Sequence, residues 1–173
     1  DGLERRGHIF KSHSDTETII HAYEEWGADC VRQFRGIFAF AIYDCRKHEL
    51  FLARDHVGVK PLYYYDDREN FIFASQPKAI IEAEGFRKVV DPEAFSLYLA
   101  FGNAPADRSI FQGVKKLLPG HRLILRDGQV RTESYWTLRY TPLIVNQEEA
   151  ERAISEKVRE CVVAQSVSDV PIG

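Results

Sequence analysis

The sequence predicts an α+β fold with antiparallel β-sheets. Short apolar or aromatic segments follow one another with polar turns between them, at residues 37–43, 50–53, 62–65 and 71–74. A second observation is the Asp127-Gly128 pair, which is typical of a two-residue hairpin turn. A third is a set of helix-capping sequences on both sides of these segments. Together they favour an antiparallel sheet buried under helices or under a second sheet.

The apolar run at residues 37–43 is expected to be the central strand. It is unbroken, too short for a buried helix, and closed by Asp44. Strands that are covered on both faces have such continuous apolar sequences. We therefore expect this strand to be buried on both faces, with the 50–53 strand returning beside it.

Arg54 and Asp55 place adjacent opposite charges where the 50–53 strand ends. A structural ion pair or turn is the favoured interpretation, and a polar site at the strand end is the alternative. Gly58 and Pro61 then bracket a bend before the aromatic strand at 62–65.

The N-terminal part predicts helices before the sheet. Residues 3–7 resemble the tail of a helix, and Ser14 precedes Glu17 at the spacing of a capping box. The helix that follows has an apolar stripe and ends at Gly27. Asp15 lies in its first turn, where a carboxylate complements the helix dipole.

Further elements are predicted after the sheet. Residues 76–81 favour a short helix, and Asp91-Pro92 favours a helix that ends at Gly102. A hairpin is expected around Asp127-Gly128. Residues 137–146 are predicted to be a domain boundary, followed by a helix with a buried stripe at Ala150, Ile154, Val158, Cys161 and Val162.

Composition excludes several classes of partner. The chain has 173 residues, 45% of them hydrophobic, and a net charge of −3 without a block of like charges, so neither nucleic acid nor an anionic membrane is favoured. The three cysteines form no Cys-x-x-Cys pair and indicate reduced thiols in a cytoplasmic protein. The six histidines are not paired at metal-ligand spacing, so no metal is expected.

The chain contains no methionine and begins with Asp1-Gly2-Leu3. This composition is expected of an internal fragment of a longer protein. No complete catalytic set is visible within it. Cys45 lies in a predicted turn near Arg46 and His48, but an exposed turn provides no water-excluded site, so a nucleophilic Cys45 is not favoured. Cys161 is interpreted as core packing.

Several segments, in order, strongly resemble the glutamine-hydrolysing asparagine synthetases: Ser-Asp-Thr-Glu (14–17), His-Ala-Tyr-Glu-Glu-Trp-Gly (21–27), Gly-Ile-Phe-Ala-Phe-Ala-Ile-Tyr-Asp (36–44), Ala-Arg-Asp-His-Val-Gly-Val-Lys-Pro-Leu-Tyr-Tyr (53–64), Lys-Lys-Leu-Leu-Pro-Gly-His (115–121), Tyr-Trp (135–136) and Ser-Asp-Val-Pro-Ile-Gly (168–173). The resemblance implies an N-terminal-nucleophile (Ntn) hydrolase-type αββα sandwich, truncated at its N-terminus. Residues 1–140 would be the later part of the glutamine amidotransferase domain. Residues 141–173 would be the linker and first helix of the synthetase domain.

The resemblance assigns one substrate-binding residue. Asp15 is expected to bind the α-ammonium group of glutamine, because the family has an acidic residue at this place in the Ser-Asp pair. The N-terminal cysteine nucleophile and the Ser-Gly-Gly-x-Asp-Ser loop for ATP have no counterpart in the chain. The fragment is therefore expected to be inactive and to bind no cofactor, while the longer protein would use ATP, Mg²⁺, glutamine and aspartate. A homodimer is an open alternative for its assembly.

Two other hypotheses remain. The chain would belong to a related amidotransferase-like enzyme with another acceptor, such as a β-lactam-forming or peptide-cyclising homologue. Alternatively it would be a non-catalytic module that binds a partner. The sequence upstream of Asp1 would separate these hypotheses, because an N-terminal cysteine is required only by a working glutaminase.

Overall fold

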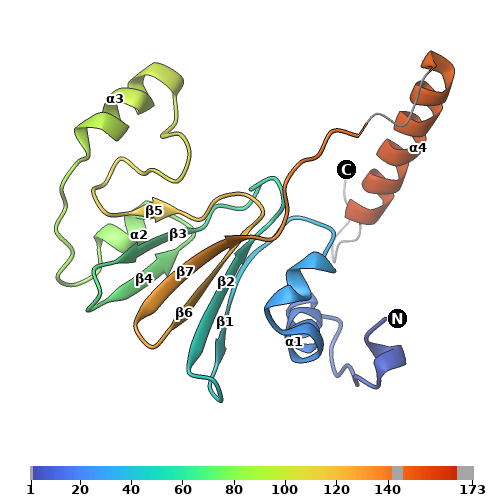
Figure 1. The fold of residues 1–173 in the computed structure, drawn as a ribbon, viewed down its shortest axis with the longest axis horizontal. Coiled ribbons are helices and arrows are strands. Elements are labelled where there is room, and N and C mark those ends of the chain that lie inside the picture. Colours follow the sequence, from blue (N-terminus) through green and yellow to red (C-terminus); the bar gives the residue numbers. More distant parts are fainter. Residues whose placement is uncertain (1, 142–145, 167–173) are drawn as a thin grey trace. The chain divides into compact units, whose positions relative to one another are not determined.

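A computed structural model describes residues 2–141 and 146–166 (Figure 1). The chain divides into two compact units, Asp1–Thr137 and Leu138–Gly173. Part of the predicted boundary, residues 142–145, and the C-terminal residues 168–173 lie outside the described residues. In the part of the chain that the structure describes, no helix is long and apolar enough to cross a membrane.

The first unit contains two antiparallel sheets. Sheet A has the order β1-β2-β6-β7 and is formed by Ala39–Asp44, Glu49–Arg54, His121–Arg126 and Gln129–Ser134. Sheet B has the order β4-β3-β5 and is formed by Phe71–Ala74, Tyr63–Asp66 and Lys115–Lys116. The predicted α+β class with antiparallel sheets is confirmed. The turn between β6 and β7 has positive φ at Asp127 and Gly128, as a type I′ hairpin requires.

Helices lie before and between the strands. The first are η1 (Glu4–Arg6), α1 (Asp15–Trp26) and η2 (Gly27–Arg32). Two more, α2 (Pro77–Ile81) and α3 (Pro92–Phe101), follow β4. Asp91 caps α3 by accepting from Glu93 N and Ala94 N, and Gly102 ends it, as predicted.

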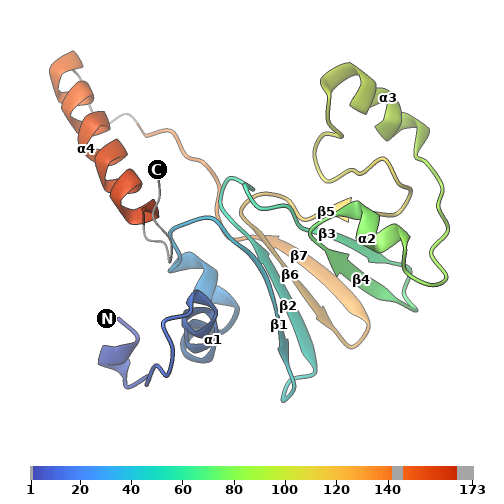
Figure 2. The same cartoon turned by 180° about the vertical axis from the view of Figure 1, so that it is seen from behind.

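Two apolar clusters hold the layers together. One lies between α1, η2 and one face of sheet A, and includes Tyr23, Phe51 and Ala53. The other lies between the opposite face of sheet A and sheet B, and includes Leu52, Leu62 and Leu123. Figures 1 and 2 show α1 on one side of sheet A and sheet B on the other. Period-two alternation along β2 sends successive side chains into the two clusters.

The prediction of a central strand at residues 37–43 is wrong. The strand β1 begins at Ala39 and lies at the edge of sheet A, with β2 as its partner. Ile37 is 45% exposed and Tyr43 is 58% exposed, so the run is not buried on both faces. The strand that is covered on both faces is β2, which lies between β1 and β6 and sends its side chains alternately into the two clusters.

The capping box at α1 forms only in part. Ser14 Oγ accepts a hydrogen bond from Thr16 N at 3.2 Å, as a cap should. Glu17 does not return to Ser14 but accepts from the backbone N–H groups of Lys11 and Ser12, both at 2.7 Å. Glu17 therefore fastens the segment that enters α1 instead of closing the box.

The second unit contains α4, Gln147–Gln165, which is capped by Asn146. The predicted apolar stripe is present on this helix, but the helix has no buried residues. Ile154, Val158 and Val162 are exposed, and Cys161 is exposed too. The interpretation of Cys161 as core packing is therefore wrong within this unit, because no described residue of the unit covers the stripe.

Candidate functional site

A cavity of about 870 Å³ opens where α1 begins, beside β1. Its walls come from the stretch 37–43 and from Asp15, Thr16, Ile19, Ile20, Lys60, Pro61 and Ser75. The cavity is open on this side because β1 is an edge strand, and its walls are mainly apolar. Its described lining residues include one carboxylate, Asp15, and one ammonium group, Lys60.

Asp15 is the first residue of α1, and its side chain is exposed. The Thr16 hydroxyl donates to Asp15 Oδ1 at 3.4 Å. No cation among the described residues forms an ion pair with this carboxylate. Asp15 therefore stands at the cavity with its charge available to a ligand.

The backbone before Asp15 is fixed by Glu17. The Ser12 hydroxyl donates to Glu17 Oε2 at 2.5 Å, in addition to the two backbone donors. These hydrogen bonds, led by that of Ser12, lower the pKa of Glu17 to about 2. An ionised Glu17 thus holds the entry to α1, and with it the position of Asp15, across the neutral pH range.

Arg54 and Asp55 build the loop between β2 and β3 that carries Lys60 and Pro61. Arg54 donates to the carbonyls of Lys60, Leu117 and Gly58 at 2.6–2.7 Å. Asp55 accepts from the backbone N–H groups of Val57, Val59 and Lys60 at 2.9–3.2 Å. The turn interpretation is confirmed: both charges hold backbone and neither lines the cavity.

Gly58 is required in this loop. Its φ is +70°, and a Cβ built on it would lie 2.7 Å from Pro119 Cγ and 3.0 Å from the Arg54 guanidinium. A side chain there would collide with the group that the loop is built around. The compact loop therefore depends on glycine, and it sets where Lys60 and Pro61 meet the cavity.

None of the three cysteines lines the cavity. Cys30 is buried, and burial raises its pKa to about 11, so it is a poor nucleophile. Cys45 and Cys161 are exposed. No residue that lines the cavity supplies a thiol for covalent chemistry on an amide.

A second cavity of about 770 Å³ lies against another part of α1. Leu3, Phe10, Trp26 and Phe34 are among its lining residues, and Glu4 is the one carboxylate among those that the structure describes. We place the candidate site in the first cavity because it contains Asp15. Sequence reasoning singled out Asp15 but missed the other cavity walls, since nothing in the apolar run at 37–43 signals an open edge.

The fold is similar to that of a solved structure. The chain is similar to the glutamine phosphoribosylpyrophosphate (PRPP) amidotransferase from B. subtilis, solved with ADP and GMP, with a TM-score of 0.52 and 21% identity. The match covers 79% of this chain and 26% of that one. The shared feature is a mixed α+β fold with antiparallel sheets.

The sequence is similar to those of several known proteins. Asparagine synthetase [glutamine-hydrolyzing] 3 of Bacillus subtilis is 34% identical over 171 residues, which is 98% of this chain and 28% of that protein. A putative asparagine synthetase [glutamine-hydrolyzing] 2 of Methanocaldococcus jannaschii is 36% identical over 92% of this chain and 32% of its own length. Amidase chry2 of Gibberella zeae is 32% identical over 94% of this chain and 24% of its own length.

The chain thus spans about 28% of the length of the first of these relatives. Residues 1–136 match the glutamine amidotransferase domain family. This match covers nearly all of the first compact unit and includes Asp15 with the rest of the cavity. The chain therefore belongs to the glutamine amidotransferase domain family and is related to the glutamine-hydrolysing asparagine synthetases.

Proposed function

We propose that this chain forms the glutamine-binding part of a glutamine-hydrolysing amidotransferase, in which Asp15 binds the α-ammonium group of glutamine. The observation that supports this proposal is the position of Asp15, whose exposed carboxylate borders a largely apolar cavity and pairs with no described cation. Glutamine differs from a simple amide in carrying a cationic α-amino group, which is what such a carboxylate recognises.

The chemistry of the cavity suits this ligand. A charge-assisted hydrogen bond contributes roughly 1.5–3 kcal/mol. The cavity lies within the usual range of about 300–1,000 Å³ for small-molecule sites. The methylene groups of glutamine would lie along the apolar walls while Asp15 holds the charged end.

The proposal assigns the nucleophile to residues outside this chain. No thiol lines the cavity, and the resemblance implies an N-terminal cysteine in an Ntn-type αββα sandwich. In this view the present residues supply two sheets, the covering helix α1 and the substrate carboxylate. The reaction would be attack of that thiolate on the glutamine side-chain amide, with release of ammonia.

In the longer protein, the ammonia would be used to convert aspartate to asparagine with ATP. This assignment follows the names of the relatives and the resemblance of the chain to them. The pyrophosphate loop that the resemblance implies has no counterpart in the sequence, so we assign none of these residues to ATP or Mg²⁺.

The test is Asp15→Asn in the full-length protein. The amide keeps the shape of the side chain but removes the charge, so kcat/KM for glutamine should fall about ten- to 150-fold. Activity with ammonium chloride should be retained, because free ammonia bypasses the glutamine site. Both activities are measured as asparagine formation.

Asp127→Asn is the matched control, since Asp127 is an exposed carboxylate in the β6–β7 turn away from the cavity. It should leave both activities unchanged. Equal losses with glutamine and ammonium in Asp15→Asn would instead assign Asp15 to the helix dipole alone, where it contributes about 0.3–1 kcal/mol to stability.

A second candidate function is amidation of another acceptor. The observation that favours it is a relative that is not named an asparagine synthetase, Amidase chry2, whose match covers 94% of this chain. The two candidates share the glutamine site and differ in the acceptor. Asparagine formation from aspartate by the full-length protein would support the first, and glutamine- and ATP-dependent consumption of another carboxylic acid would support the second.

A further inference from the structure

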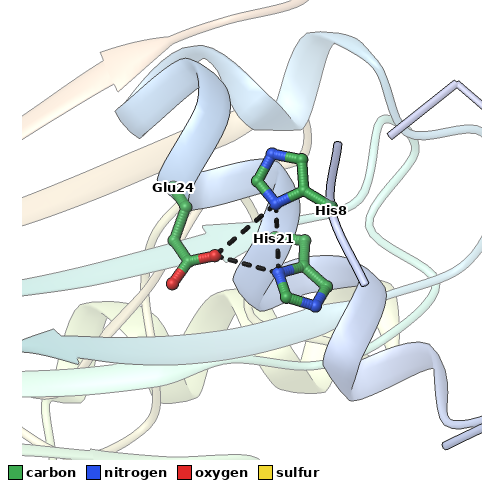
Figure 3. Close-up of side chains that lie close together, drawn as sticks. All are labelled: His8, His21 and Glu24. Carbon is green, nitrogen blue, oxygen red and sulfur yellow. Dashed lines mark hydrogen bonds and ion pairs between the residues drawn. The ribbon is translucent and has the colours of Figure 1, made fainter. Parts of the chain in front are cut away.

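Three metal-ligating side chains converge on the middle of α1 (Figure 3). His21 and Glu24 are three residues apart on α1, and His8 reaches them from the segment that follows η1. The His21 Nδ1 lies 2.9 Å from Glu24 Oε2 and 3.2 Å from His8 Nδ1. The His8 Nδ1 lies 3.7 Å from the same Glu24 oxygen. None of the three residues lines the Asp15 cavity.

The other nitrogen of each ring faces a second carboxylate. His8 Nε2 lies 3.2 Å from Glu25 Oε2. His21 Nε2 is buried and has no hydrogen-bond partner among the described residues, and Glu17 Oε1 lies 3.6 Å from it. Without a metal, the nearer Glu24 carboxylate accepts from His21 Nδ1–H at 2.9 Å. In a metal-bound cluster each Nε2 is assigned the ring hydrogen instead, because the carboxylates facing it only accept.

This assignment leaves three acceptors facing one another. With hydrogen on both Nε2 atoms, each neutral ring presents a lone pair at Nδ1, and Glu24 adds a carboxylate oxygen. In this tautomer no hydrogen lies between the three atoms, so a metal ion or a proton on one of the rings is needed to join them. Figure 3 shows the two Nδ1 atoms and the Glu24 oxygen directed toward a common point.

We propose that His8, His21 and Glu24 form a Zn²⁺ site. A triangle with sides of 2.9, 3.2 and 3.7 Å has a point about 2 Å from all three corners, which matches Zn–N and Zn–O bonds of roughly 2.0–2.2 Å. Two imidazoles and one carboxylate are ligands that zinc accepts, and they disfavour Mg²⁺ and Ca²⁺, which take oxygen ligands. The fourth position is open to water.

The surroundings fit a zinc site as well. Metal-bound histidines commonly donate their other N–H to a carboxylate, and Glu25 and Glu17 lie in those positions. The Phe10 ring meets the His21 ring edge-on at 4.8 Å between centroids and covers that side of the cluster. Both imidazoles are shielded, with side chains 16% and 18% exposed.

The proposal departs from the expectation that the sequence holds no metal site. His8 and His21 are thirteen residues apart, and no local spacing links them, so the pattern of histidines along the chain does not predict the pair. The pairing arises because the segment before Ser14 runs back along α1. A bound ion would therefore fasten that segment to the helix whose first residue is Asp15.

The experiment is a calorimetric titration of the protein with ZnCl₂ at neutral pH. Melting curves with and without ZnCl₂ are a second measurement. The background carries Cys45→Ser and Cys161→Ser, which removes the exposed thiols that bind zinc nonspecifically. We expect this protein to bind one Zn²⁺ more tightly, by at least about tenfold, than the same background carrying His21→Gln or Glu24→Gln. Zinc should raise the melting temperature, and millimolar MgCl₂ should not.

Controls separate a metal site from a general effect. Glu24 is 58% exposed, so Glu24→Gln is expected to fold even if His21→Gln does not. His13→Gln, which changes an exposed histidine outside the cluster, should leave zinc affinity unchanged. Glu25→Gln should weaken binding by about 10- to 100-fold without removing a ligand.

Bound Co²⁺ provides an independent readout, because four- or five-coordinate Co²⁺ absorbs visible light far more strongly than the octahedral ion. The strong absorption should disappear in Glu24→Gln. If the protein binds no stoichiometric Zn²⁺, or if Glu24→Gln and His21→Gln bind it as tightly as the background protein, the cluster holds only a proton and the proposal is wrong.

Discussion

At the scale of single residues, Asp55 shows how a buried charge serves the backbone. It is 1% exposed, and its carboxylate accepts from three backbone N–H groups within five residues. Burial alone would raise the pKa of Asp55, but these N–H donors outweigh it and lower the pKa. The folded protein therefore favours the ionised form more than the unfolded chain does.

This balance predicts a pH-dependent stability. Because the folded pKa of Asp55 lies below that of the unfolded chain, about 3.9, its contribution is complete above that pH and is lost as pH falls through the folded value. Asp55→Asn should lower the free energy of unfolding by roughly 3 kcal/mol at pH 7, because the amide removes the charge and replaces one of the two acceptor oxygens with an NH₂ donor. The difference between the two proteins should shrink below about pH 4.

Urea unfolding of both proteins at pH 7 and near pH 3 measures this difference. Asp127→Asn serves as the control, because Asp127 lies exposed in the β6–β7 turn and its replacement should change stability little at either pH. A stability difference for Asp55→Asn that is the same at both pH values would show that the charge of Asp55 is not what holds the loop.

At the scale of elements, the order of strands decides which side chains form the core. Phe51, Leu52 and Ala53 of β2 are fully buried, since β1 and β6 flank this strand and layers cover both of its faces. In β1, Phe40 and Ile42 pack toward α1, while Ala41 and Tyr43 are exposed. Apolar side chains in these two adjacent strands therefore contribute differently to the free energy of unfolding.

We expect Phe51→Ala to destabilise the chain by about 3–5 kcal/mol, because it leaves a cavity between α1 and sheet A. Tyr43→Ala, on the exposed side of the edge strand, should cost about 0.5 kcal/mol or less. Thermal or urea unfolding of the two variants provides the comparison. Similar losses for both would mean that another part of the protein covers β1.

These two strands also show which features of the fold can be predicted from the sequence. The strands and the Asp127-Gly128 turn were predictable because they depend on neighbours in the chain. The central position of β2 was not, since it depends on β6, a strand about seventy residues further on. Residue type and resemblance identified Asp15. They did not identify the cavity beside it or the pairing of His8 with His21, because both depend on contacts between residues that are distant in the sequence.

At the scale of the whole molecule, the two units differ in how they use apolar residues. The first unit buries its apolar side chains in two clusters between layers. The second has a helix whose stripe of Ile154, Val158 and Val162 is 57–63% exposed. Contiguous exposed apolar surface of this kind is typical of an interface. From the resemblance, we propose that residues 141–173 are the linker and first helix of a synthetase domain that would cover this stripe.

The cysteines provide a test of this proposal, because the reactive species is the thiolate and each cysteine has a different environment. In the 173-residue chain, Cys45 and Cys161 should react with iodoacetamide in the native state, whereas Cys30, which is buried and has its pKa raised to about 11, should react only after unfolding.

In the full-length protein, a synthetase domain packed on α4 should slow the alkylation of Cys161 by roughly tenfold or more. Cys45, in the β1–β2 turn, should react alike in both and is the internal control. Mass mapping of the alkylated peptides over time gives the three rates. Equal rates for Cys161 in the two proteins would show that α4 stays uncovered and that its apolar stripe is not the start of a packed domain.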